Sequence, residues 1–185
     1  VGYLVRTMAL KGNNYISAVD KDPKRNENQN EDKTSLLISS GDGQDLTAGG
    51  LVGTHENYQD KGSVTIQDTA IFGEVHLQSP GNNGMTGGFI GRLGRGNMAN
   101  ATITNSFASI YCKSNGDSGR AGGFIGEVAA GNPWGKGITI KNCYAAGHNG
   151  DEVNVSGYFA GGFFGSDMSD LAQFMTVSDV YSTCS

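Results

Sequence analysis

The chain has 185 residues, of which 37% are hydrophobic and 30 are glycine, and it carries a formal net charge of −5 with a pI near 5.1. This length and apolar content suffice for one domain with a buried core, whereas the acidic balance offers no basic surface to nucleic acid or anionic lipid. No stretch approaches the roughly 18 apolar residues of a membrane span. The chain begins at Val1 without an initiator methionine or a signal peptide, which indicates a processed mature form or an excised fragment.

Residues 1–48 contain strand-like segments and one hydrophilic run. Residues 2–5 look like a degenerate glycine motif, and residues 15–19 and 36–38 have the composition of strands. Between the last two, Lys21 to Lys33 mixes both charges and predicts a long exposed loop. We expect residues 1–48 to form a degenerate first coil. A short capping helix over Leu4 to Lys11 is the alternative, because terminal repeats are often atypical.

A two-part pattern occurs four times in residues 49–185. The first part is two glycines, two apolar residues and a third glycine, at residues 49–53, 87–91, 122–126 and 161–165. The second part is threonine, an aliphatic residue, any residue and an asparagine or aspartate, at residues 65–68, 102–105, 139–142 and 176–179. The second part recurs with a constant step of 37 residues, whereas the glycine motifs are spaced less evenly. A repeat of this length indicates a solenoid, a propeller or an array.

Alternating residues around the second motif predict a strand with one buried face. Its aliphatic residues should stack inward in one column: Ile66, Ile103, Ile140 and Val177. This inward column should end in polar residues that form a hydrogen-bonded ladder: Asp68, Asn105, Asn142 and Asp179. An aromatic stack should follow two positions later: Ala70, Phe107, Tyr144 and Tyr181.

The glycine motif suits a corner that needs either a positive φ or a close approach of two backbones. One of its two apolar columns should face the core, and a loop should cover the other. Each buried large side chain contributes about 1.5–3 kcal/mol, so the repeats are stable only when they stack.

These features predict an all-β fold, namely a right-handed parallel β-solenoid (β-helix) of about five coils with long loops. Residues 49–185 would form four of these coils. A small β-propeller is the alternative, but its blades need four strands each and the repeat shows only two or three.

The repeat resembles the GLUG repeat, which occurs in tandem in bacterial surface adhesins and in the non-catalytic regions of immunoglobulin A-cleaving proteases. The matching pieces are the glycine motifs at 87–91 and 122–126 and the stretch Ile140 to Gly147, and the resemblance covers residues 46–185. It implies secretion, a cell-surface setting and a right-handed β-solenoid, and it brings no catalytic residues. The chain departs from the family in its longer loops and in its unmatched first quarter.

The sequence assigns no catalytic, cofactor-binding or metal-binding residues. His55, His76 and His148 fall at unrelated positions of the repeat without metal-ligand spacing, and we expect them to be solvated loop residues. The turns at 115–117 and 149–152 contain aspartate and asparagine and could bind calcium, but ordinary turn chemistry explains them. The three cysteines, Cys112, Cys143 and Cys184, permit one disulfide and a free thiol, or they are small buried hydrophobes.

We therefore expect a non-enzymatic extracellular or cell-surface module: an adhesin segment, a surface stalk or a self-assembling filament subunit. The last strand, Met175 to Ser182, leaves an open edge, so the expected partner is another solenoid end. That end belongs to a second copy, head to tail, or to the rest of a longer parent chain. A host surface glycan or protein is a further candidate partner.

Two alternative functions remain. Some parallel β-helices are carbohydrate-active enzymes, which need two or three convergent carboxylates. An ice- or surface-binding solenoid is less favoured. It would use the outward threonines Thr65, Thr102, Thr139 and Thr176, but Lys141 interrupts that surface.

Overall fold

The computed structural model describes residues 3–4, 8–10, 14–18, 36–55, 63–94, 100–129, 137–147, 155–167 and 175–184. Within these ranges the chain forms strands and turns and no helix, and every recorded strand pair is parallel. The predicted all-β class with parallel sheets is confirmed. The propeller alternative is wrong, because propeller blades are antiparallel sheets.

The strands form three sheets. Sheet A has five strands in the order β1 (Tyr3–Leu4), β6 (Val52–His55), β10 (Ile90–Leu93), β13 (Ile125–Val128) and β17 (Phe164–Asp167). Sheet C has four in the order β16 (Phe159–Gly161), β12 (Arg120–Gly122), β9 (Met85–Gly87) and β5 (Thr47–Gly49). Sheet B follows the order β18 (Met175–Ser182), β14 (Gly137–Ala145), β11 (Asn100–Ser114), β7 (Val64–Gln67) and β2 (Met8–Leu10). It is extended by β8 (Thr69–Ser79), β3 (Asn14–Ala18), β4 (Leu36–Ser39) and β15 (Val155–Gly157).

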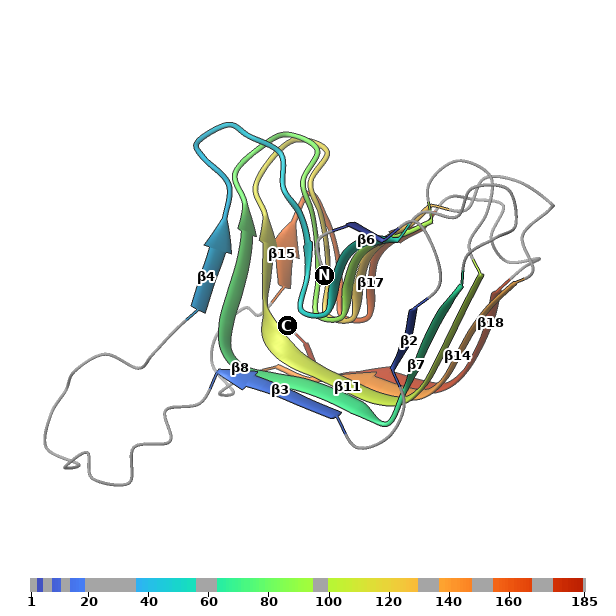
Figure 1. The fold of residues 1–185 in the computed structure, drawn as a ribbon. Coiled ribbons are helices and arrows are strands. Elements are labelled where there is room, and N and C mark those ends of the chain that lie inside the picture. The colour runs from blue at the N-terminus through green and yellow to red at the C-terminus, as the bar shows by residue number, and fades with distance from the viewer. Residues whose placement is uncertain are drawn as a thin grey trace, which may run out of the picture.

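Equivalent strands of successive repeats lie one behind another in Figure 1. Sheet B is a wide curve that runs from β7, β14 and β18 at the right, through β11 at the bottom, to β4 and β15 at the left. Sheet A, with β6 and β17, lies inside this curve. The chain therefore passes through the three sheets in the same order in each repeat.

The register between repeats follows the sequence step. Ile103 pairs with Ile66 on one side and with Ile140 on the other, and Ile140 pairs in turn with Val177. The three isoleucines are fully buried, as the predicted inward column requires. Parallel pairing in this register therefore places equivalent side chains of successive repeats next to one another.

The first four strands add a layer to this stack. β1 pairs with β6, β2 with β7, and β3 and β4 both pair with β8. The alternative of a capping helix is wrong, because Leu4 and Met8–Leu10 are strand residues. The hydrophilic run at 21–33 lies outside the described residues.

The glycine motif turns the chain from sheet C into sheet A. Gly87 ends β9 and Gly91 lies in β10, and neither has a positive φ. A Cβ on Gly87 would overlap the carbonyl oxygen of Ile90 and lie 2.5 Å from the amide nitrogen of Gly126. Of the two reasons expected for these glycines, close approach of two backbones is therefore the one that applies.

Both apolar columns of the glycine motif belong to the core. Phe89 stacks on Phe124 with ring centroids 4.5 Å apart, and both rings are fully buried. Ile90 and Ile125, in the second column, are equally buried and belong to the same cluster. The expectation that only one column joins the core is wrong.

A ladder of polar side chains marks the corner of sheet B where β7 gives way to β8. Asp68, Asn105 and Asn142 all have left-handed backbones, with φ of 52°, 51° and 52°. The Asn105 amide donates to Asp68 at 2.8 Å, and the Asn142 amide donates to Asn105 at 2.9 Å. The predicted hydrogen bonds are confirmed across these three repeats, but the predicted inward position of the ladder is wrong, because Asn105 and Asn142 are exposed. The left-handed residue at the corner interrupts the alternation of inward and outward side chains along the strand. The ladder side chains therefore point toward solvent.

Substitution of Gly87 tests the backbone contact between sheets A and C. Gly87→Ala should lower the free energy of unfolding by about 3 kcal/mol or more, because the new methyl group overlaps backbone that cannot move aside. The matched control is Gly41→Ala, whose Cβ would meet nothing closer than the Gln44 Cγ at 3.9 Å, and it should change stability by less than about 0.5 kcal/mol. Urea unfolding followed by circular dichroism measures both. Equal effects would contradict the assigned role of Gly87.

Substitution of Asn105 separates backbone conformation from hydrogen bonding in the ladder. Asn105→Ala should lower the free energy of unfolding by about 2–3 kcal/mol, because it adds left-handed strain and removes two amide contacts. Asn105→Gly keeps the backbone conformation and should cost only about 1 kcal/mol. Both are measured by urea unfolding, and a glycine variant no more stable than the alanine variant would refute this division.

Candidate functional site

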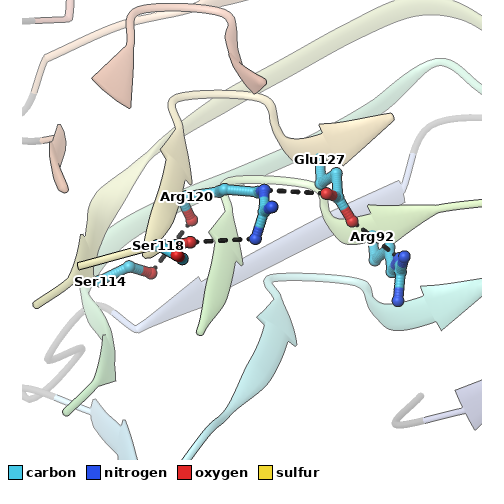
Figure 2. Close-up of polar contacts among 5 residues, drawn as sticks. All are labelled: Arg92, Ser114, Ser118, Arg120 and Glu127. Carbon is cyan, nitrogen blue, oxygen red and sulfur yellow. Dashed lines mark hydrogen bonds and ion pairs between the residues drawn. The ribbon is translucent and has the colours of Figure 1, made fainter. Parts of the chain in front are cut away.

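One cluster of charged side chains stands out from the repeat, around Glu127 in β13. Its Oε2 lies 2.8 Å from the Arg92 Nε of β10, and its Oε1 lies 2.8 Å from the Arg120 Nε of β12 (Figure 2). The Glu127 side chain is only 4% exposed, while the two arginines are 22% and 24% exposed. The contact with Arg92 is an ion pair without the alignment of a hydrogen bond.

Arg120 has further contacts that hold it in place. Its Nη1 donates to the Ser118 carbonyl at 2.9 Å, and its guanidinium lies over the Phe159 ring, 5.9 Å from the centroid. The Arg120 carbonyl accepts from the Ser114 hydroxyl at 3.0 Å. The cluster therefore joins sheet A to sheet C and both to the end of β11.

The chemistry of this cluster is that of a structural ion pair. Each oxygen of Glu127 lies 2.8 Å from an arginine Nε, and the side chain is only 4% exposed, so the carboxylate is engaged in ion pairs inside the fold. Glycoside hydrolysis needs two carboxyl groups about 5–9.5 Å apart, and this cluster contains one. The arrangement holds strands together and offers no acid and base pair.

The sequence analysis missed this cluster because it occurs once. In the register of sheet A, Glu127 is paired with Arg92, and Arg92 with Thr54. No recurring pattern marks these positions. Alignment of the repeats on their glycine motifs would have placed the two opposite charges in neighbouring strands, and that was the available signal.

Neutralisation of Glu127 tests the cluster. Glu127→Gln leaves two partly buried guanidinium groups without their counter-charge and should lower the free energy of unfolding by about 3 kcal/mol. Asp117→Asn makes the same charge change at an exposed turn and should cost less than about 0.5 kcal/mol. Thermal and urea unfolding of both variants provide the measurement, and a Glu127 variant as stable as the control would exclude a structural role.

The predicted loop position of the histidines is wrong for two of the three. His55 is fully buried at the end of β6, where it pairs with Leu93 of β10. His76 lies in β8, and its ring stacks on Tyr111 at 4.3 Å. Both lie in strands but outside the two repeated motifs, so the repeat pattern does not predict their positions. His148 lies outside the described residues.

The turn at 115–117 contacts the preceding repeat through its backbone. The Asn115 amide donates to the Ser79 carbonyl at 2.9 Å, and the Ser118 amide donates to the Asn82 carbonyl at 3.0 Å. Among the described residues no group of three or more His, Cys, Asp or Glu side chains could hold a metal ion. The second proposed calcium turn, 149–152, lies outside the described ranges.

The three cysteines are free thiols in the structure. Burial raises the pKa of Cys143 to about 11, and its sulfur donates to the Lys141 carbonyl at 3.3 Å. Burial also raises the pKa of Cys112. It raises the pKa of Cys184 as well, although that thiol is less completely buried. A raised thiol pKa suppresses the thiolate, so Cys112 and Cys143 act as small buried hydrophobes, and Cys184 packs partly buried against the same core.

The outer face of sheet B carries the aromatic stack and the threonine column. Phe107 stacks on Tyr144 at 4.3 Å, and Tyr144 stacks on Tyr181 at 5.0 Å, which confirms the predicted stack from the second repeat onward. In the threonine column Thr102 is exposed. Lys141 is also exposed beside that column, so the surface is not free of charge.

Comparison of the chain with protein-family models, with curated proteins and with solved structures finds no match. In the part of the chain that the structure describes, no helix has the length and hydropathy of a membrane span.

Proposed function

We propose that the chain is a right-handed β-solenoid of about five coils that serves as a non-enzymatic extracellular or cell-surface module, as an adhesin segment, a surface stalk or a filament subunit. The observation that carries this proposal is the constant register of sheet B. Ile66, Ile103 and Ile140 lie in one column, and the same order of sheets recurs in each repeat. Right-handed connections between parallel strands are the rule, which supports the handedness.

A structural role is supported by how the chain uses its side chains. The repeated residues make columns of apolar, aromatic and amide groups, which stabilise the stack. The one buried carboxylate of the described core, Glu127, is held by two arginines. The resemblance to the GLUG repeat supports a surface setting. A stack of this kind presents an extended surface of variable loops, which suits contact with a host glycan or protein.

An assay of turnover and adhesion tests this function against the carbohydrate-active alternative. The purified chain is incubated with a panel of polysaccharides, and new reducing ends and unsaturated products are measured beside a mock preparation from cells without the gene. We expect no product above the mock preparation. Beads coated with the chain are then passed over the same polysaccharides and over host matrix proteins, where retention would assign the adhesin role. Turnover by the chain would overturn the proposal.

A further inference from the structure

The polar ladder at the corner of sheet B contains too few hydrogen-bond donors. Its four side chains share a left-handed backbone, with φ between 51° and 54°: Asp68, Asn105, Asn142 and Asp179. The register of β14 with β18 pairs the residues on either side of Asn142 with those on either side of Asp179. Asp179 therefore stands beside Asn142 as Asn142 stands beside Asn105. Four side chains in one column leave three gaps between neighbours, and each gap needs one donor.

Each asparagine fills one gap. The Asn105 Nδ2 donates to the Asp68 Oδ1 at 2.8 Å, and the Asn105 Oδ1 accepts from the Asn142 Nδ2 at 2.9 Å. An amide that donates to one neighbour thus turns its oxygen toward the other. The Asn142 nitrogen is directed at Asn105, and an ionised carboxylate only accepts hydrogen bonds. The gap between Asn142 and Asp179 therefore places one acceptor beside another, without a donor between them.

This shortage does not depend on the direction of the amides. Two asparagines cannot fill three gaps whichever way they are turned, because the first and the fourth side chain are both carboxylates. A donor beyond Asp179 would bond that carboxylate and leave the gap beside Asn142 unchanged. The column Asp68 to Asp179 is therefore short of a single hydrogen atom.

We infer that the ladder takes up one proton in acid, and that the protonated carboxyl of Asp179 donates its O–H to the Asn142 Oδ1. The three gaps are then filled. Asn142 and Asp179 are exposed, so the proton comes from the solvent and returns to it. The unfolded chain offers no such acceptor, so the contribution of this bond to stability is present in acid and is lost as the pH rises. This pH-sensitive device belongs to the fold and does not rest on the proposed surface role.

One other charged side chain lies near the ladder in the described part of the chain. It is Lys141 of β14, which is exposed and forms no ion pair with Asp179. Cys143 points into the core, and Tyr144 and Tyr181 stack two positions beyond the ladder. Thiol, phenol and ammonium groups titrate well above carboxyl groups. No charged residue occurs in β2, β3, β7, 69–72 or 102–109. Proton uptake in acid at this corner therefore belongs to its two aspartates.

Two substitutions and their combination test the count of donors. Asp179→Asn supplies the third donor directly, and Asp68→Asn supplies it when all amides turn the other way, with Asp179 as the last acceptor. The double variant adds a fourth donor, for which no gap remains. The two positions are three strand spacings apart, about 14 Å, so effects unrelated to the ladder would add. Asp117→Asn, at an exposed turn outside the ladder, controls for the loss of one negative charge.

Urea unfolding of all variants is followed at pH 7 and at about pH 4. At pH 7 each ladder variant should raise the folding equilibrium constant about two- to tenfold, as one net hydrogen bond does, and Asp117→Asn should not. The double variant should gain no more than either single one. At about pH 4 the advantage over the unaltered chain should shrink, because that chain now holds the missing proton. Additive gains, gains no larger than that of Asp117→Asn, or gains that persist undiminished in acid would overturn the inference.

Discussion

The close backbone contact between sheets A and C is the constraint on which the rest of the structure depends. Gly87 and Gly126 approach so closely that no Cβ fits between the sheets, and the equivalent glycines repeat this contact in the other layers. Because the two sheets are joined by a turn of only a few residues, the phenylalanine in that turn is held on the phenylalanine of the next layer. One steric requirement thus fixes the turn, the sheet spacing and the central aromatic column.

Stacking in register makes each layer the template for the next. The Asn105 side-chain amide donates to Asp68 and accepts from Asn142. The hydrogen-bonding groups of a middle layer are thus paired with the equivalent residues of the two layers beside it. Each layer therefore contributes to the stability of the layers on either side of it, as in other repeat proteins.

Features that recur in every repeat could be predicted from the sequence, whereas features that occur in one repeat could not. The step of 37 residues was enough to place Ile103 between Ile66 and Ile140, because a strand register has to match a repeat of constant length. His55 was misplaced because its column contains Leu93 and no other histidine. The ion pairs of Glu127 were missed for the same reason, since a residue that occurs in one repeat has no periodic signal. The left-handed corner was compatible with asparagine and aspartate, but nothing in the sequence distinguished it from an extended strand end.

One departure from the repeat lies in the last described turn between sheets B and C. Ser114 and Arg120 are separated by a turn of five residues, whereas in the next layer the equivalent Gly157 and Phe159 are separated by Tyr158 alone. The shortened connection brings the Phe159 ring under the Arg120 guanidinium, which is itself fixed by Glu127. The charged cluster and the shortened turn together connect the last described strand of sheet C to the layer before it.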